Sequence, residues 1–314
     1  MSVPLRVGTR GSALALTQSK QAVALLEAAG TPVELIVIRT SGDKMKDIPL
    51  AKVGGKGLFI KELEEALRGG SIDFAIHSMK DVPAQLPEGF ALGAISTRAD
   101  ARDVLVRSPA HRGLPPGLDA LPTGARIGTG SLRRRAQLVA LRPDLEIVPI
   151  RGNVDTRIGK AESGELDAVM LAAAGIARLG LDVPIDPLPA EIFLPSAGQG
   201  FLAIEIRMGD TATERLLQPL HDPAAAQAAT AERAFVGALD ASCTAPVAAW
   251  CRERDGLLVC DGLVASLDGR EMLRTSLSAK ATEAADLGRR VAGALLARGA
   301  AHILAEVERQ MAED

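Results

Sequence analysis

Consecutive arginines follow a glycine turn near the middle of the chain, and their position predicts an anion-binding site. The turn is Gly128-Thr-Gly130, and Ser131 stands where the N-cap of a helix over Leu132–Leu141 is expected. Arg133 and Arg134 then fall in the first helical turn, where the partial positive charge of a helix N-terminus disfavours cations. An anion held by backbone N–H groups, hydroxyls and guanidinium groups would explain them. The alternative for this stretch alone is a solvated basic helix start.

The same pattern occurs near the N-terminus. Leu5-Arg-Val-Gly-Thr-Arg-Gly-Ser12 predicts a strand, a Gly-Thr turn and a serine cap before a helix over about Ala13–Ala29. A second pair of segments also matches, Gly70-Ser-Ile-Asp-Phe-Ala-Ile76 and Gly164-Glu-Leu-Asp-Ala-Val-Met170, and each predicts a turn leading into a buried strand. The repeats indicate two homologous α/β halves whose anion-binding turns share the cleft between them.

Two further segments of the first half carry candidate functional residues. His77-Ser-Met-Lys-Asp-Val-Pro83 leaves the carboxyl end of a predicted strand, which is where open α/β sheets bind ligands. Asp81 is the only acid of this segment, and the alternative role for it is a turn or cap residue. For His77 a hydrogen-bonded structural role is preferred. The insertion Lys44–Gly57 is too rich in glycine and lysine to form a core, and predicts a mobile flap with two cations, Lys52 and Lys56.

The remaining segments predict the domain organisation. Thr97–Arg102 and Leu194–Gly200 are expected to be the two passages between the halves, which would give a hinge. The chain after His221 predicts a small α+β domain with a three-stranded antiparallel sheet turned at Asp255-Gly256 and Asp268-Gly269. We therefore expect an α/β lobe over residues 1–99 and 198–220, a second α/β lobe over 100–197, and an α+β domain over 221–314.

Composition limits the class of ligand. The net charge of −3 gives no general basic field for nucleic acid or an anionic membrane, and aromatic residues, 2% of the chain, are too few to stack bases. No segment is apolar over the length of a membrane span. The three cysteines all follow residue 240 and predict neither a disulfide framework nor a metal site, so a reducing cytoplasm is expected. Basic residues confined to loops of a mildly acidic protein favour a small polyanionic ligand.

Taken together, seven segments resemble the porphobilinogen deaminase (hydroxymethylbilane synthase) family, in the same order along nearly the whole chain. They are Gly8-Thr-Arg-Gly-Ser12, Leu50-Ala-Lys-Val-Gly-Gly-Lys-Gly-Leu-Phe59, His77-Ser-Met-Lys-Asp-Val-Pro83, Gly128-Thr-Gly-Ser-Leu-Arg-Arg134, Arg151-Gly-Asn-Val, Leu194-Pro-Ser-Ala-Gly-Gln-Gly200 and Cys243. The resemblance implies two periplasmic-binding-protein-like lobes with a hinge and a third domain bearing a cysteine. It also implies a cytoplasmic, monomeric transferase of haem and porphyrin biosynthesis that needs no metal. Such an enzyme joins four porphobilinogen molecules into linear hydroxymethylbilane and releases ammonia.

The resemblance also assigns roles to residues. A dipyrromethane cofactor would be held by a thioether to Cys243, and Asp81 would be the catalytic carboxylate that stabilises cationic intermediates. Each pyrrole carries an acetate and a propionate, which arginine binds well. The implied cofactor ligands are Ser12, Lys80, Thr129, Ser131, Arg133, Arg134 and Arg157. The implied substrate ligands are Arg10, Arg151, Arg157, Arg178 and Gln199, so that Arg157 serves both.

Two departures from the family pattern leave alternatives open. Ala241 and Ser242 stand where the family usually has glycines before the cysteine, and would be strained if a positive φ is needed there. Asp155 replaces a usual glycine, and could pair with Arg151 or Arg157 and weaken carboxylate binding. The competing functions are a two-lobed receptor for a small dicarboxylate and a divergent relative that binds tetrapyrroles without making them. The receptor would not require Asp81 or the cysteine loop.

Overall fold

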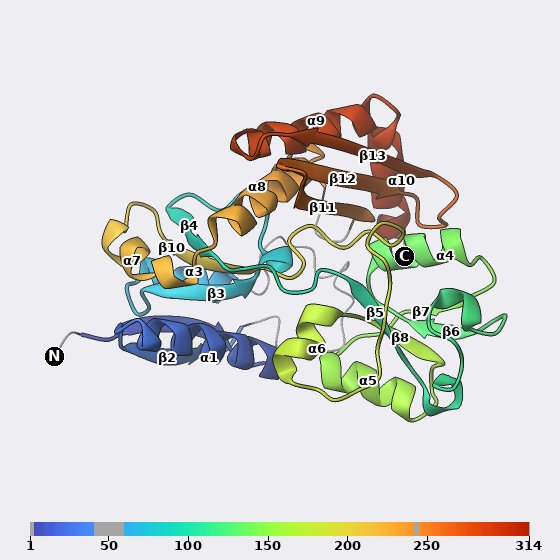
Figure 1. Cartoon of the computed structure of the whole chain (residues 1–314), viewed down its shortest axis with the longest axis horizontal. Helices are drawn as coiled ribbons and strands as arrows, with labels where there is room; N and C mark the ends of the chain where they lie inside the picture. The colour runs from blue at the N-terminus through green and yellow to red at the C-terminus, as the bar shows by residue number, and fades with distance from the viewer. Residues whose placement is uncertain (1–2, 41–59, 242–244, 314) are drawn as a thin grey trace.

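The computed structural model describes residues 3–40, 60–241 and 245–313, and Figure 1 shows them as two α/β lobes beneath a smaller C-terminal domain. Lobe 1 is built on a five-stranded sheet of order β2-β1-β3-β10-β4. Its strands are β1 (Leu5–Arg10), β2 (Val33–Ile38), β3 (Phe74–Ser78), β4 (Phe90–Ile95) and β10 (Leu202–Arg207). Its helices are α1 (Ala13–Ala28), α3 (Lys61–Arg68), α7 (Thr211–Leu216) and the 3-10 turns η1 (Met79–Asp81) and η4 (Gln218–Leu220).

Lobe 2 repeats this design with a sheet of order β7-β6-β8-β5-β9. Its strands are β5 (Asp103–Arg107), β6 (Arg126–Gly128), β7 (Glu146–Val148), β8 (Ala168–Ala172) and β9 (Asp186–Pro187). Its helices are α4 (Leu132–Leu141), α5 (Val154–Glu162), α6 (Ala173–Leu179), η2 (Pro109–His111) and η3 (Leu118–Ala120).

The predicted internal repeat is confirmed by strand order and by glycine geometry. In each lobe one antiparallel strand, β10 or β5, pairs with the strand that follows the repeated Gly70 or Gly164 turn. These two glycines have positive φ values of 68° and 74°. Gly8 and Gly128 lie at matching places on β1 and β6, where a Cβ would come within 2.4 Å of Ile72 and 2.6 Å of Leu166. Both halves therefore need glycine at this position, because a side chain would clash with the apolar residue that leads into the neighbouring strand.

Strands β4, β5 and β9 were not expected from the sequence. Gly93 interrupts the apolar pattern of β4, because the side chain of Ile206 on β10 occupies the space that a Cβ would need. Strand β5 begins and ends with a charged residue, Asp103 and Arg107, although both side chains are buried. Each of these side chains forms an ion pair inside lobe 2. A charged residue at the end of this strand therefore does not indicate exposure to solvent.

The C-terminal domain has the predicted α+β architecture, and the expected fold class is confirmed. Its antiparallel sheet has the order β11-β12-β13, and helices α8 and α9 pack against each other over it. Its elements are β11 (Val247–Arg254), β12 (Leu257–Ala265), β13 (Met272–Ala279), α8 (Pro223–Ala238), η5 (Ala281–Glu283), α9 (Ala284–Leu296) and α10 (Ala300–Glu313). Within residues 3–40, 60–241 and 245–313, no helix combines the length and apolar character of a membrane span.

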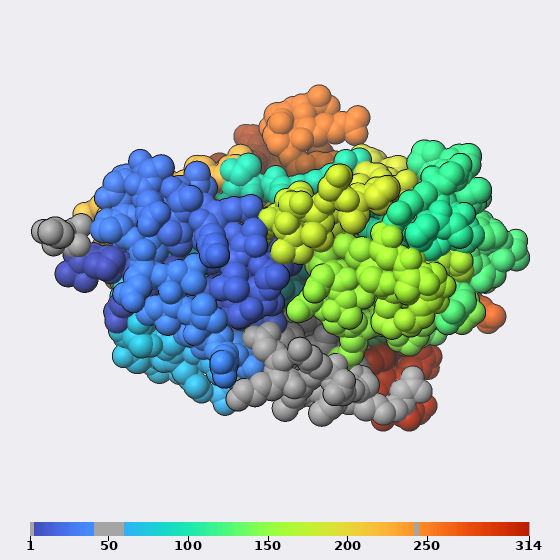
Figure 2. Space-filling model, turned by 90° about the horizontal axis from the view of Figure 1, so that it is seen from below, coloured from blue at the N-terminus to red at the C-terminus, as the bar shows by residue number. Residues whose placement is uncertain are grey.

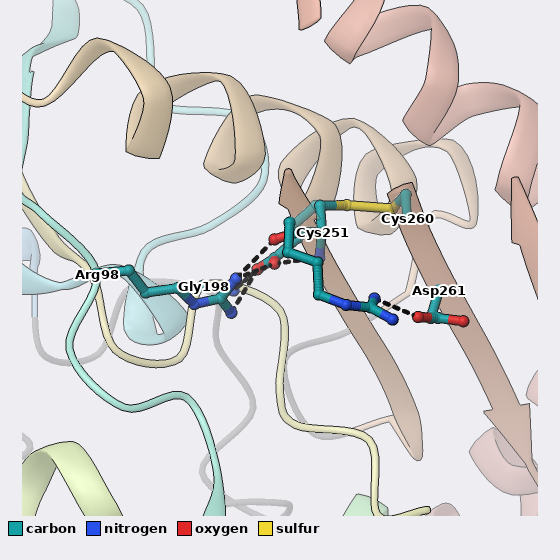
Figure 3. The surroundings of a disulfide bond; sticks show 7 residues. Arg98, Gly198, Cys251, Cys260 and Asp261 are labelled. Atoms are coloured by element: carbon teal, nitrogen blue, oxygen red, sulfur yellow. Dashed lines mark hydrogen bonds and ion pairs between the residues drawn. A yellow bond between two sulfur atoms is a disulfide. The ribbon is translucent and has the colours of Figure 1, made fainter. Parts of the chain in front are cut away.

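The cysteine prediction is wrong for two of the three thiols. Asp255 and Gly256 make the expected tight turn, with φ values of 53° and 77°, and this fixes the register of β11 against β12. Cys251 lies directly opposite Cys260, with 4.0 Å between the Cα atoms, and the two sulfurs form a disulfide (Figure 3). The cysteine argument for a reducing compartment therefore loses this support.

A buried ion pair fastens the C-terminal domain to the passages between the lobes. Arg98 Nη1 donates to Glu232 Oε1 of α8 at 2.7 Å and to the Cys251 carbonyl at 3.0 Å (Figure 3). Glu232 also accepts from the backbone N–H groups of Gly198 and Cys251, at 2.6 and 2.7 Å. One carboxylate thus joins a segment of each passage to the strand that carries the disulfide.

The closest approach of helices α8 and α9 provides a test of the C-terminal fold. A Cβ on Gly288 would lie 2.1 Å from the Ala231 carbonyl oxygen, whereas nothing lies within 4 Å of a Cβ on Gly293 in the same helix. We expect Gly288→Ala to lower the free energy of unfolding by roughly 1–3 kcal/mol through overpacking. Gly293→Ala should raise it by roughly 0.5–1 kcal/mol through helix propensity. Urea denaturation measures both, and a Gly288→Ala protein at least as stable as wild type would contradict this packing.

Candidate active site

A cleft of about 370 Å³ lies between the two lobes. In Figure 2, the blue first lobe and the green second lobe meet along a furrow. Lobe 1 contributes the α1 N-terminus and the turn after β3, and lobe 2 contributes the N-terminus of α5 and helix α6. The return passage between the lobes, at Gly198–Phe201, closes one wall.

The cleft wall gathers cations. Its charged residues in the described part of the chain are Arg10, Lys80, Arg134, Arg157, Arg178, Asp81 and Asp155, which gives five cations against two acids. Ser12 and Gln199 also line it. The structure therefore brings together most of the residues that the sequence singled out for anion binding, although they come from six separate segments of the chain.

Serine caps at the two repeated turns are confirmed. Ser12 Oγ accepts from Ala15 N at 3.3 Å at the start of α1, and Ser131 Oγ accepts from Arg134 N at 3.4 Å at the start of α4. The caps fix the first helical turn because they satisfy backbone donors that have no partner within the helix. Ser12 faces the cleft, while Ser131 does not line it.

The two arginines of α4 converge on a buried acid, Asp103, which sequence reasoning missed. Arg133 Nη1 donates to Asp103 Oδ2 at 2.7 Å, and Arg134 Nη2 donates to Oδ1 at 2.7 Å. Burial alone would raise the pKa of Asp103, but the two guanidinium groups outweigh it and hold that pKa far below its usual range. The signal in the sequence was an acid directly before a short apolar run, Val104-Leu-Val106.

Arg133 and Arg134 differ in their access to the cleft. Arg133 is buried, donates a second bond to the Leu194 carbonyl at 2.7 Å, and does not line the cleft. Arg134 lines the cleft while its Nη1 donates to the Met170 carbonyl at 3.0 Å. Three further predicted ligands also lie off the cleft wall, namely Thr129, Ser131 and Arg151. The roles of Arg133 and these three residues stay predictions.

Lys80 sits where burial and like charge act together. Its Nζ donates to Gln199 Oε1 at 3.2 Å, and Gln199 Nε2 donates in turn to Asp103 Oδ1 at 3.0 Å and to the Ala101 carbonyl at 2.7 Å. Burial, and then the neighbouring Arg134, lowers the pKa of Lys80 to about 8. Gln199 thus links the turn of lobe 1 to the buried acid of lobe 2.

Two other cations share this environment. Burial, followed by the charges of Arg134 and Arg151, lowers the pKa of Arg157, and burial lowers the pKa of Arg178. Each guanidinium has one hydrogen bond to a backbone carbonyl, from Arg157 Nε to Gly152 and from Arg178 Nη2 to Gly200, both at 2.8 Å. A partly buried cluster of positive charges favours an anionic ligand, because the ligand reduces the repulsion between the cations.

The remaining predicted residues have diverse positions. Asp81 ends the 3-10 turn after β3 and is exposed to the cleft. His77 is hydrogen-bonded to Glu205, as expected of a structural histidine. Lys52, Lys56 and Cys243, together with the rest of the predicted flap, lie outside the described residues. No group of three His, Cys, Asp or Glu side chains in the described ranges could hold a metal ion.

Comparison with known proteins decides the family. Residues 5–215 match the porphobilinogen deaminase dipyromethane cofactor binding domain, and residues 226–297 match the porphobilinogen deaminase C-terminal domain. Porphobilinogen deaminase of Syntrophus aciditrophicus is 49% identical over 307 residues, which cover 97% of this chain and 99% of that protein. The chain belongs to the porphobilinogen deaminase family. Relatives of the same name from Syntrophobacter fumaroxidans (48%, covering 97% of this chain and 98% of the relative) and Syntrophotalea carbinolica (49%, 98% and 97%) agree.

Family membership confirms the activity and the cofactor predicted from the motifs. Porphobilinogen deaminases are transferases of tetrapyrrole biosynthesis that polymerise porphobilinogen into hydroxymethylbilane on a dipyrromethane cofactor. The cleft fits such a group, because the carboxylates on each pyrrole need several cations close together and the described wall holds five. One of them, Arg134, is also paired with the buried Asp103.

Two of the residues that depart from the porphobilinogen deaminase pattern, Ala241 and Asp155, have mild structural effects, and the third, Ser242, lies outside the described residues. Ala241 does not have a positive φ; the positive value falls one residue earlier, at Asp240, with φ of 47°. Asp155 is exposed at the start of α5, and within the described ranges its carboxylate forms no ion pair with Arg151 or Arg157. Asp155 therefore does not compete with a carboxylate ligand for Arg151 or Arg157.

The lowered pKa of Lys80 gives a pH test of the cleft. In protein prepared without cofactor, NMR of ¹³C-labelled lysine side chains should show Lys80 titrating near pH 8, because burial and Arg134 disfavour its ammonium form. Lys80→Met identifies the signal. Anion binding in the cleft should move the midpoint upward, since nearby negative charge favours the ammonium form. A midpoint above about 10, the value of a solvated lysine, would contradict this environment.

Proposed function

We propose that the cleft between the lobes is where this chain extends the pyrrole chain, and that Asp81 is its catalytic carboxylate. The observation that carries the proposal is the wall itself, with five cations from both lobes around an exposed acid at the end of a rigid turn. The cations bind the carboxylates of the growing chain, and Asp81 stabilises the positive charge that forms when ammonia leaves porphobilinogen.

The cations divide between cofactor and substrate. Ser12, Lys80, Arg134 and Arg157 would hold carboxylates of the dipyrromethane, with Thr129, Ser131 and Arg133 in support behind them. Arg10, Arg151, Arg157 and Arg178 would hold the incoming porphobilinogen. Support comes from the pKa of Arg157, which is lowered first by burial and then by the charges of Arg134 and Arg151, one from each group. Gln199 would act through Lys80, because its carbonyl oxygen accepts from the Lys80 Nζ.

When bound, the cofactor supplies a pyrrole whose free position attacks the next substrate. The protein has three tasks around that step. Its cations fix the carboxylates and so orient the two rings. Asp81 stabilises the positive charge that develops on the substrate as ammonia departs, and can accept a hydrogen bond from a pyrrole N–H group. The third task, that of the lobes, would be to shield the reacting rings from water, which strengthens both effects.

Three further parts of the proposal concern the whole chain. Cys243 would hold the cofactor as a thioether, in the loop between α8 and β11. Lobe 1 would span residues 1–99 and 198–220, lobe 2 residues 100–197, and the α+β domain residues 221–314. The enzyme would act as a monomer in the cytoplasm, with porphobilinogen as its small-molecule substrate and without nucleic acid, membrane or metal.

Asp81→Asn tests the catalytic assignment. The amide keeps the size and one acceptor of the carboxylate but removes its charge, so turnover should fall by roughly 10²–10³, as for loss of one preorganised electrostatic group. Asp155→Asn removes the other acid of the described wall and serves as the control, with turnover expected within about threefold of wild type. Steady-state kinetics of hydroxymethylbilane formation measures both. Near-normal turnover in Asp81→Asn would refute the assignment.

Cys243→Ser tests the site of attachment. The intact mass of the wild-type enzyme should exceed the mass of its sequence by two pyrrole units, and peptide mapping should place them on the Cys243 peptide. Cys243→Ser should fold, lack the added mass and lose turnover, because a serine hydroxyl is a far weaker nucleophile than a thiolate. Cys251→Ser removes a disulfide-bonded cysteine and should keep the added mass. An active wild-type protein without added mass would rule out the covalent cofactor.

A further inference from the structure

A buried histidine–glutamate pair lies directly behind the turn that carries Lys80 and Asp81. His77 Nε2 and Glu205 Oε2 are 2.9 Å apart, and the two side chains are only 4% and 0% exposed. They come from adjacent antiparallel strands, β3 and β10, in which Ala203 is opposite His77 and Glu205 is opposite Ala75. His77 and Glu205 are therefore diagonal neighbours on one face of the sheet.

His77 is the hydrogen-bond partner of Glu205, whose charge also acts on Arg233 of α8. The other carboxylate oxygen of Glu205, Oε1, is buried and has no hydrogen-bond partner within the described residues. Glu64 of α3 adds a second acid to the same surroundings, and burial followed by the charge of Glu205 raises the pKa of Glu64. A buried carboxylate without a partner is costly, so the bond to His77 constrains where β3 and β10 can lie relative to each other.

The other side of the turn is held by Arg233 of α8. Its Nη2 donates to the Ala84 carbonyl at 2.9 Å and its Nη1 lies 3.8 Å from Met79 Sδ. The turn begins at Met79, two residues after His77, and Ser78, Lys80 and Asp81 line the cleft. The backbone N–H of Met79 also donates to the Phe201 carbonyl at 3.1 Å. The His77–Glu205 contact thus fixes the residue before the turn to the sheet, and Arg233 holds Met79 and Ala84, on either side of Lys80 and Asp81, to α8.

We propose that His77 and Glu205 are positioning residues that hold Lys80 and Asp81 in their working geometry. The inference rests on the proposed roles of those two residues. His77 does not line the cleft and touches no substrate, so its effect passes through the turn. Lobe 2 offers a matched comparison, since His111 Nε2 contacts Asp167 Oδ1 at 2.7 Å and neither residue lines the cleft.

The experiment compares His77→Ala, His77→Gln and His111→Ala in the full-length, cofactor-loaded enzyme. His77→Ala should lower kcat by roughly 10–100-fold with KM changed less than about threefold, as expected when a catalytic group is displaced by a fraction of an ångström to an ångström. His77→Gln keeps a donor toward Glu205 and should recover most of kcat. His111→Ala should leave kcat unchanged. Equal kcat in His77→Ala and wild type overturns the proposal.

Two further variants separate positioning from stability and from the proposed function. His77→Leu/Glu205→Leu replaces both partners by apolar groups, which is close to neutral for folding, yet should still lower kcat about tenfold. A double variant with wild-type stability and wild-type kcat overturns the proposal. In the Asp81→Asn background, His77→Ala should have little additional effect, and a full additional loss overturns action through Asp81. Asp81→Asn alone reports on the proposed function, so the two failures are distinguishable.

Discussion

Repulsion among cations in a partly buried cleft is the constraint on which this structure depends. Burial, and then the charge of Arg134, lowers the pKa of both Lys80 and Arg157. A protein gains no stability from such a cluster, because desolvation and like charge both disfavour it. Its value is in binding: a polyanionic pyrrole chain relieves the repulsion, and the arginines present planar donors that match carboxylates.

Asp103 makes this arrangement compatible with a folded protein. It stands at the start of β5, directly after the first passage between the lobes. Its carboxylate forms ion pairs with both Arg133 and Arg134 of α4 and so offsets part of their positive charge. Gln199 on the return passage bonds to the same carboxylate and to Lys80. Both passages therefore meet at one buried acid, while Glu232 joins them a second time to the C-terminal domain. The hinge region and the anion site are built from the same hydrogen bonds.

Local patterns were sufficient to predict much of the fold and of the site. Helix α4 has the predicted bounds, Leu132–Leu141, because its serine cap and its apolar spacing are both local signals. The two halves were found because a turn, a cap and a strand recur in order. The Asp255-Gly256 turn was predicted too, and its centre places residue 251 opposite 260, so the disulfide could have been derived from the hairpin register.

The long-range pairings could not be predicted in this way. Asp103 and Arg133 are separated by 30 residues, and Glu205 and His77 by 128. The residues next to each of them in the sequence therefore do not indicate its partner. Strand β5 was missed for the same reason, since its terminal charges look like surface residues until their buried partners are known. A resemblance to a family transfers the roles of matched residues, but not the acid that holds two of them in place.

The central claim is that an external anion binds the cations that line the cleft while Asp103 retains Arg133. A crystal structure of the cofactor-loaded enzyme tests it most directly. The account predicts cofactor carboxylates in hydrogen-bond contact with Lys80, Arg134 and Ser12, and Arg133 still paired with Asp103. Cofactor carboxylates bound away from Lys80 and Arg134, or an Arg133 turned from Asp103 into the cleft, would contradict it.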